Sequence, residues 1–587
     1  MHAEAVMYEE EPERKFDLRS PKTAALVSFL AALIPVVLVC LVATPKYPMS
    51  PDEQVQQLFA SGRFLAAGQS LLMPYSLVTI SAPLSALYAV LPAVPWYALT
   101  LLALIVASFA VAWDKALRSR LSAGVCRTVA VLLVLLELIS TMYLTFTIVA
   151  FLAVAAGLML VVGNAAFEKV NAVRAGDVFG CVLVVLGYSL RPESGLAAIA
   201  IFAPFAVWVL AKNRHVGAIL RGVIVLALVG VCAFAGQYAY DHTAGWEGYS
   251  AYLDAGRSAL DYPDLSTEEV QAVDSSLSEN DVTILYNWLF ADDSVFNTEF
   301  FEKLGDAVPH FSISNLVASL KAKTTVLLLG LVVVAGALAW AVGKDVRCST
   351  AARALMAGIV AMMLVSCLLL IMRQRVRLHV VLPLIMCTLF ALITCAHAPE
   401  QRFGKRAAAV KGSGLLGARA AIVVPVLSCV VSLGICGVFY LKVVRPLAAQ
   451  TSSTTSAAAR AYVEEHPDEL VVFGRSQTIY FTGYNAFTLE GWDFPENMLP
   501  IGGWENHTAA WATFLERWGI EGNDVLQELP ERSDMVAVLQ PAKMEMIKTY
   551  LTEHSGREVT AEVVEDLGPG ATDPTVHVYV YKFSYAS

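Results

Sequence analysis

The stretch TAALVSFLAALIPVVLVCLVA, residues 23–43, decides the class of fold, and YPMSPDEQVQQL, residues 47–58, follows it almost directly. The first stretch contains no charged residue and has the roughly 17–25 apolar residues that a helix needs to cross a bilayer. In the whole chain 57% of the residues are hydrophobic and 16% are charged, a balance far from that of a soluble domain. The sequence therefore predicts a polytopic α-helical membrane protein.

Ten further apolar segments are predicted to cross the membrane. They lie at 95–113, 128–146, 147–163, 177–191, 195–211, 222–240, 324–343, 354–372, 378–396 and 420–441. One more apolar run, 71–91, is long enough to cross, but Pro74 and Pro83 would each remove a helical hydrogen bond.

The distribution of Lys and Arg predicts the topology, because short cytoplasmic loops carry an excess of both. If 71–91 does not cross, every basic gap but one faces the cytoplasm; if it crosses, all gaps after the first change sides. We therefore expect about eleven spans, with the N-terminus inside, the C-terminus outside and 71–91 as a re-entrant or membrane-surface segment.

This topology predicts a domain organisation. A cytoplasmic tail at 1–22 precedes a bundle at 23–441, and the bundle carries an outer loop at 44–94 and a large outer loop at 241–323. The segment 451–587 reads as a small extracytoplasmic α/β domain, because strand-like runs such as ELVVF and DMVAVL alternate with helical patterns.

Asp52 and Glu53 lie side by side where the chain leaves the first predicted span. Ser50 as N-cap, Pro51 at the first helical position and Glu53 closing a capping box would make a good helix start without any chemistry. An acidic pair against the outer membrane surface would also meet the head group of a lipid-linked substrate. Both interpretations remain open from the residues alone.

In this plan the chain resembles the GT-C class of polytopic glycosyltransferases, which use polyprenyl-phosphate sugars as donors. That class has an Asp/Glu motif in the first outer loop, then membrane-surface helices, and often a C-terminal extracytoplasmic domain; Asp52-Glu53, 71–91 and 451–587 match it. The resemblance implies that one of the two acids is the general base that takes a proton from the acceptor hydroxyl. Since adjacent helical residues point about 100° apart, we favour Asp52 and expect the capping box to hold Glu53.

The stretch MRQRVRLHVV, residues 372–381, is the one basic cluster that this topology places outside. If a helix includes this turn, Arg373 and Arg377 share a face and can grip one anion, such as a departing lipid phosphate, while Arg375 points elsewhere. Snorkelling to lipid headgroups or pairing with the acidic loop is the alternative.

Two further charges belong to the membrane region. Arg191, at the outer end of a predicted helix, could join the same substrate phosphate site or pair with Glu193. Glu137 lies within a span, where an ionisable group is costly and indicates function by default. It could pair with Arg191, face a substrate cavity, or be protonated and hydrogen-bonded. Thr145 and Thr147 could touch a sugar or cap a helix.

The large outer loop offers Trp288 beside Asp292 and Asp293. An aromatic ring next to carboxylates suits a sugar, which presents an apolar face and a rim of hydroxyls. Asp292 and Asp293 could also bind a divalent cation as a cofactor, although solvated surface charge explains two adjacent acids better.

The sequence thus predicts a glycosyltransferase in a bacterial cytoplasmic membrane, with its C-terminal domain outside. Its partners would be a polyprenyl-phosphate-linked sugar, an extracytoplasmic acceptor in the cell envelope, and the lipid bilayer. The alternatives are a transporter or flippase for a lipid-linked or anionic substrate and a non-catalytic envelope assembly protein. The sequence shows no nucleotide-binding loop and no basic nucleic-acid surface, so we expect neither an ATP-driven pump nor a nucleic-acid partner.

Overall fold

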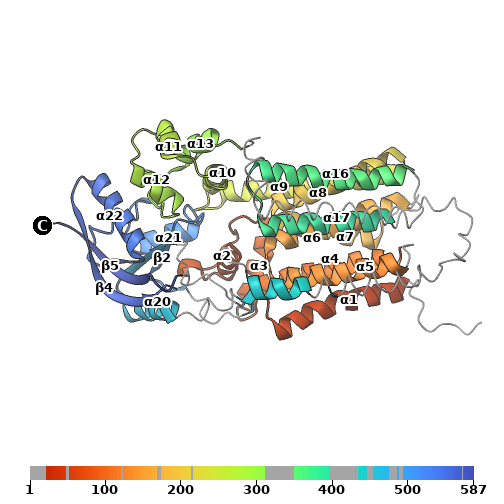
Figure 1. Cartoon of the computed structure of the whole chain (residues 1–587), viewed down its shortest axis with the longest axis horizontal. Helices are drawn as coiled ribbons and strands as arrows, with labels where there is room; N and C mark the ends of the chain where they lie inside the picture. Colours follow the sequence, from red (N-terminus) through yellow and green to blue (C-terminus); the bar gives the residue numbers. More distant parts are fainter. Residues whose placement is uncertain are drawn as a thin grey trace, which may run out of the picture.

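A computed structural model describes residues 21–47, 52–119, 123–167, 173–212, 216–310, 350–396, 430, 434–445, 454–474, 485–487, 494–570 and 573–586. The molecule is elongated. A helical bundle forms one half, and a β-sheet with the helices of the large outer loop forms the other half (Figure 1). The C-terminus lies at the tip of the sheet half, away from the bundle (Figure 1).

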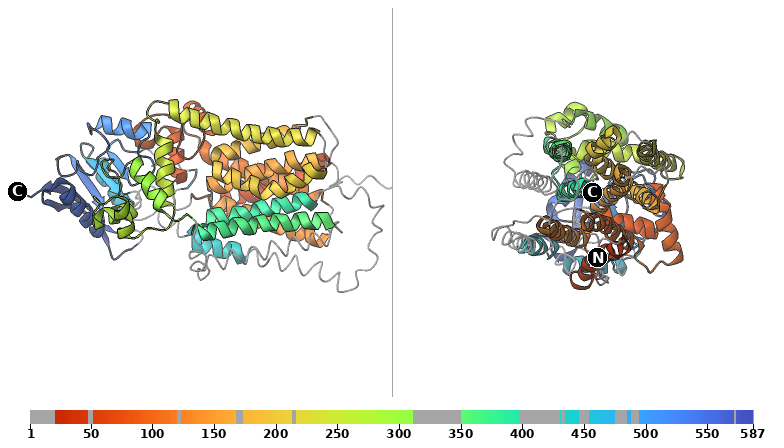
Figure 2. Two further views of the ribbon diagram at one scale, coloured as in Figure 1. Left: turned by 90° about the horizontal axis from the view of Figure 1, so that it is seen from above. Right: turned by 90° about the vertical axis from the view of Figure 1, so that its right-hand side faces the viewer.

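Nine helices make up the described bundle. They are α1 (Pro21–Val42), α4 (Trp96–Leu117), α5 (Ala123–Met142), α6 (Phe146–Phe167), α7 (Ala175–Leu190), α8 (Pro192–Lys212), α9 (Val216–His242), α16 (Thr350–Met372) and α17 (Leu378–Ala396). Eight of them, all but the 16-residue α7, are long and apolar enough to cross a membrane. They run roughly parallel to the long axis of the molecule (Figure 2).

The predicted spans agree with these helices to within a few residues wherever the structure describes them. The span 324–343 and most of 420–441 lie outside the described residues, apart from a short π-helix, η3 (Tyr440–Val444), and its neighbours. The segment 71–91 contains α3 (Val78–Val90), whose 13 residues are fewer than a membrane span needs. The total number of spans and the orientation remain predictions.

Helix α6 is the centre of the bundle and packs tightly against α7. Glycines make this approach possible: a Cβ atom on Gly157 would lie 2.5 Å from the carbonyl oxygen of Gly180. A Cβ atom on Gly187 would lie 2.8 Å from the carbonyl oxygen of Ala150. Small residues of this kind allow helix backbones to meet closely inside a membrane.

The large outer loop is folded into four short helices. They are α10 (Tyr249–Leu260), α11 (Thr267–Val273), α12 (Glu279–Tyr286) and α13 (Thr298–Ala307). Capping boxes start two of them: Ser266 and Glu269 at α11, and Ser278 and Asp281 at α12. The stretches TEEVQAVDSSL and NTEFFEKLG contribute α11 and α13.

The C-terminal segment forms a mixed five-stranded sheet of order β2-β1-β3-β5-β4. Its strands are β1 (Leu470–Gly474), β2 (Met498–Ile501), β3 (Met535–Leu539), β4 (Val559–Pro569) and β5 (His577–Tyr585), and its helices are α20 (Thr454–Glu465), α21 (Ala509–Arg517) and α22 (Pro541–Ser555). The strands β2, β1 and β3 are parallel, and β5 and β4 continue the sheet antiparallel. This agrees with the expected α/β domain, and the runs ELVVF and DMVAVL form β1 and β3.

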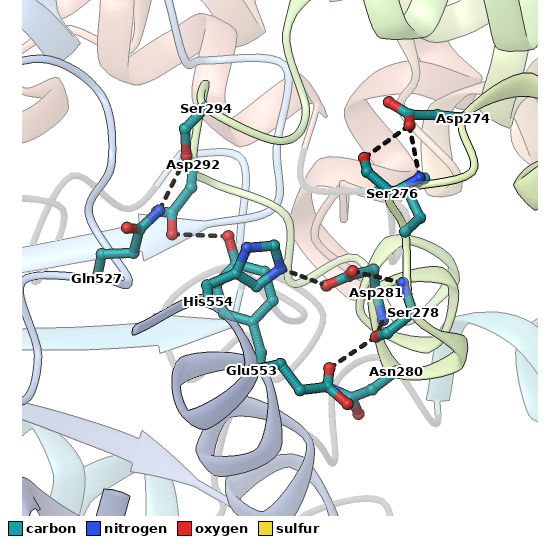
Figure 3. Close-up of polar contacts among 12 residues, drawn as sticks. Asp274, Ser276, Ser278, Asn280, Asp281, Asp292, Ser294, Gln527, Glu553 and His554 are labelled. Carbon is teal, nitrogen blue, oxygen red and sulfur yellow. Dashed lines mark hydrogen bonds and ion pairs between the residues drawn. The ribbon is translucent and has the colours of Figure 1, made fainter. Parts of the chain in front are cut away.

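The outer-loop helices are joined to the C-terminal domain through buried carboxyl groups (Figure 3). Asp292 is fully buried and accepts hydrogen bonds from the N–H of Leu526 at 2.7 Å and from the hydroxyl of Tyr550 at 2.9 Å. Asp281 pairs with the Nε2 atom of His554 at 2.8 Å. Since both contacts cross between segments far apart in the sequence, they hold the two regions as one body.

Candidate active site

The first outer loop lies at the junction between the bundle and the sheet half. Residues after α1 run beside two distant segments: Lys46 forms isolated bridges with Tyr143 and with Asn485, and the N–H of Ala486 donates to the carbonyl of Pro45. Helix α2 (Asp52–Ser61) follows and lies between the two halves (Figure 1).

Buried glutamines hold α2 in place. Gln54, Gln56 and Gln57 are all fully buried. The amide oxygen of Gln56 accepts hydrogen bonds from the hydroxyls of Ser76 and Tyr97, both at 3.0 Å, and the amide oxygen of Gln57 accepts one from Tyr47. A buried, hydrogen-bonded helix of this kind fixes the orientation of the two acidic residues at its start.

Glu53 points into this buried region and is only 2% exposed. Burial, together with the adjacent Asp52, raises the pKa of Glu53 to about 8, although a hydrogen bond with the Thr145 side chain and the charge of Arg191 act in the opposite direction. Within the part of the chain that the structure describes, its Oε2 atom makes no hydrogen bond. The capping box expected for Glu53 stays a prediction, because Ser50 lies outside the described residues; within them the Glu53 side chain contacts Thr145.

Asp52 is half-buried at the first position of α2 and so is the more accessible of the two acids. Its charge acts on His379, the second residue of α17. The same histidine is within electrostatic range of Arg191, Arg377 and Arg375. Segments far apart in the sequence therefore bring an acid, a histidine and three arginines to one end of the bundle.

The arginine-bearing turn does not have the expected helical geometry. Helix α16 ends at Met372 and α17 begins at Leu378, and Gln374 between them has a left-handed φ of 51°. The prediction that Arg373 and Arg377 share one helical face is therefore wrong, because the helix stops before both.

Arg375 and Arg191 are held by ion pairs. The Nη2 atom of Arg375 lies 2.7 Å from Asp261 at the end of α10, and its guanidinium lies over the ring of Tyr262 at 5.8 Å. Arg191, in the link from α7 to α8, lies 3.8 Å from Glu193, and its guanidinium stacks on the ring of Phe146 at 4.8 Å. Pairing with the acidic loop and with Glu193 were the alternatives for these two arginines.

Arg257 of α10 connects these two pairs. Its Nη1 atom lies 2.6 Å from Glu193, and its Nε atom lies 3.4 Å from Asp261. The five charges therefore alternate in one row, the five-charge row, in the order Arg191, Glu193, Arg257, Asp261, Arg375. The row thus holds three cations and two anions, and its two end arginines, Arg191 and Arg375, lie within electrostatic range of His379.

Glu137 lies apart from the acidic pair. Its side chain is fully buried in α5 beside the indole of Trp113 on α4, and among the described residues neither carboxyl oxygen has a hydrogen bond of ordinary geometry. Pairing with Arg191 is not what is found, since the ion pair of Arg191 is with Glu193.

The remaining candidates belong to the contact between the outer loop and the C-terminal domain. Trp288 packs edge-on against Trp504 with ring centroids 5.4 Å apart. Asp293 contacts the Nε2 atom of His507 at 3.0 Å and accepts from the amide of Asn523 at 2.8 Å. With Asp292 buried against Leu526 and Tyr550, both acids serve protein donors, and no group of three metal-ligating side chains gathers within the described residues.

Sequence reasoning did not single out His379, Arg257 or Asp261 as partners in one site. His379 stood in the quoted basic stretch, and Asp261 lay in the acidic loop, so their residue types were visible. Their proximity depends on α10 folding back onto the end of the bundle, which no local pattern encodes.

The chain matches no protein-family model, and it matches no curated protein sequence. Among solved structures it is similar to the crystal structure of ArnT from Cupriavidus metallidurans in the apo state. The two chains share 13% sequence identity with a TM-score of 0.37, and the alignment covers 96% of this chain and 98% of that one. A likeness of this size does not assign the chain to a family.

Proposed function

We propose that this protein is a membrane glycosyltransferase that moves a sugar from a polyprenyl-phosphate donor to a hydroxyl group of an extracytoplasmic acceptor. One observation carries the proposal: Asp52 and the arginines Arg191, Arg375 and Arg377 all lie within electrostatic range of His379, at the end of the bundle next to α2. Glycosyl transfer from a lipid phosphate needs a base for the acceptor and cations for the leaving group.

The chemistry requires one bond to form and one to break. The acceptor oxygen attacks the anomeric carbon, the bond from that carbon to the phosphate oxygen breaks, and the polyprenyl phosphate leaves with the electron pair. Asp52 takes the acceptor's proton, because it is the acid that a substrate can reach. The arginines stabilise the charge that develops on the departing phosphate.

Glu53 supports this division of roles. With a pKa of about 8 it is mostly protonated at neutral pH, and a protonated Glu53 does not oppose a negative charge on its neighbour. At 2% exposure it is also too buried to meet an acceptor directly. We assign it to positioning α2 through its contact with Thr145.

The test measures release of polyprenyl phosphate by the purified chain from a panel of polyprenyl-phosphate sugars. Asp52→Asn is expected to lower the rate about 10²–10⁴-fold. Glu53→Gln, an uncharged analogue of protonated glutamic acid, should retain a rate within about tenfold of wild type at pH 7. Asp241→Asn, at the end of α9, is the matched control, since its carboxyl group bonds the exposed amide of Gln237. A wild-type rate in Asp52→Asn would refute the proposal, and loss in Glu53→Gln alone would move the base to Glu53.

A further inference from the structure

The five-charge row ends on the arginine turn, and its last carboxylate, Asp261, occupies a helix position that disfavours a negative charge. Asp261 is the C-cap residue of α10, where the negative end of the helix dipole disfavours an acid. Its compensation comes from two guanidinium groups, Arg257 at 3.4 Å and Arg375 at 2.7 Å. One of these is in its own helix and the other belongs to the turn between α16 and α17.

The contact with Asp261 leaves Arg375 partly open. Within the described residues Arg375 pairs with this one carboxylate, through Nη2, and its side chain keeps an exposed fraction of 31%. The ring of Tyr262 supports the guanidinium from one side. Its other N–H groups can therefore donate to a ligand without breaking the pair.

The other end of the five-charge row holds a second guanidinium, that of Arg191, in the same way. Glu193 contacts Arg191 at 3.8 Å and Arg257 at 2.6 Å, and Phe146 stacks on Arg191. Arg257 thus fixes the distance between the two carboxylates, and the carboxylates fix the distance between Arg191 and Arg375. Both arginines act on His379, as does Arg377.

We propose that Asp261 is a positioning residue, which holds Arg375 so that it forms, with Arg191 and Arg377, a site for the phosphate group of a lipid phosphate. The inference rests on the proposed function and names the residue that sets the geometry of its leaving-group site. A fixed guanidinium binds phosphate better than a mobile one, because less conformational entropy is lost on binding.

The experiment measures binding of farnesyl phosphate to the full chain in detergent, with inorganic phosphate and farnesol as separate arms. Asp261→Asn is expected to bind farnesyl phosphate about tenfold more weakly, the size of losing one charge-assisted hydrogen bond. Glu299→Gln is the matched control, because it changes the net charge equally but removes only the exposed pair with Lys303. Asp261→Glu, which keeps the charge, should recover part of the affinity.

A double-mutant cycle separates positioning from a general effect on the fold. If Asp261 acts through Arg375, Asp261→Asn should cause no further loss in an Arg375→Gln background. Removing a carboxylate near a phosphate site should otherwise tighten binding by electrostatics. Equal or tighter binding by Asp261→Asn, or additive losses in the cycle, would overturn the proposal while leaving the proposed function intact.

The three probes decide whether the bound phosphate group comes from a lipid phosphate or from free phosphate, and whether the proposed function stands. Farnesyl phosphate bound more tightly than both other probes supports a lipid phosphate. Preference for inorganic phosphate would overturn the lipid assignment. If wild type binds none of the phosphates, the leaving-group site and the proposed function both fail.

Discussion

The contact between the outer-loop helices and the C-terminal domain should weaken as the pH rises, and Asp292→Asn should remove most of this dependence. Burial raises the pKa of Asp292 to about 7, although Leu526 and Tyr550 donate hydrogen bonds to its oxygens. The ordinary pKa of an aspartic acid side chain is 3.8. A carboxyl group with a raised folded-state pKa contributes stability that is complete below the unfolded pKa and lost as the pH rises towards the folded pKa.

The magnitude follows from the same values. Between pH 5 and pH 7 the folded chain keeps the proton and the unfolded chain does not, so each pH unit lowers the free energy of unfolding by up to about 1.4 kcal/mol. Wild type should therefore lose up to about 3 kcal/mol over this range relative to Asp292→Asn. His554 contributes to stability in the same direction, because its hydrogen bond to Asp281 raises the pKa of its imidazole. This contribution is lost only as the pH rises above the usual imidazole pKa of 6.5.

The assay is denaturant unfolding of the full chain in detergent at pH 5, 6 and 7, followed by tryptophan fluorescence. Hydrogen exchange of the peptide containing Leu526 gives a local readout, because the N–H of that residue is donated to Asp292. Glu299→Gln, an exposed carboxylate on α13, is the control and should follow wild type. A difference between wild type and Asp292→Asn that stays constant from pH 5 to pH 7 would refute the reasoning.

Two further predictions concern the bundle. Gly157→Ala should lower stability in detergent by about 1–3 kcal/mol, because the new methyl group would meet the backbone of Gly180. Thermal unfolding measures the effect, and Gly222→Ala, with open space around the new methyl group, is the control. Equal melting temperatures of the two variants would contradict the close packing of α6 on α7. Glu137→Gln should leave sugar transfer within about twofold of wild type if the protein is the proposed enzyme, whereas a transporter that uses this buried carboxyl group for protons should lose uptake of its substrate into vesicles.

The described helices of the bundle could be predicted from the sequence because a membrane span is a local property. About twenty consecutive apolar residues indicate a membrane span whatever surrounds them, so α1 and α4 could be predicted without knowing what they pack against. In the same way, Ser266 followed by Glu269 marks the start of α11.

The candidate site was only partly predictable, because its geometry depends on where chain segments end in space. The acidic pair was identified from its place after the first span, but the glutamines that bury α2 look like an ordinary polar helix face. The arginines were identified as a group, yet their spacing suggested a helix where the chain makes a turn at Gln374. The pairing of Arg375 with Asp261 joins residues more than one hundred positions apart, and a single sequence carries no signal for it.

The bridges of Lys46 to Tyr143 and Asn485 have a consequence for biogenesis. The first outer loop emerges early in synthesis, but the backbone partner that Ala486 offers to Pro45 is made only after the bundle has been translated. During synthesis the surroundings of α2 therefore stay incomplete until residues 485–486 have been made and have folded onto them. A nascent chain that stalls before that point would contain most of the bundle helices but would lack the backbone partners at 485–486 that Pro45 and Lys46 have in the folded protein.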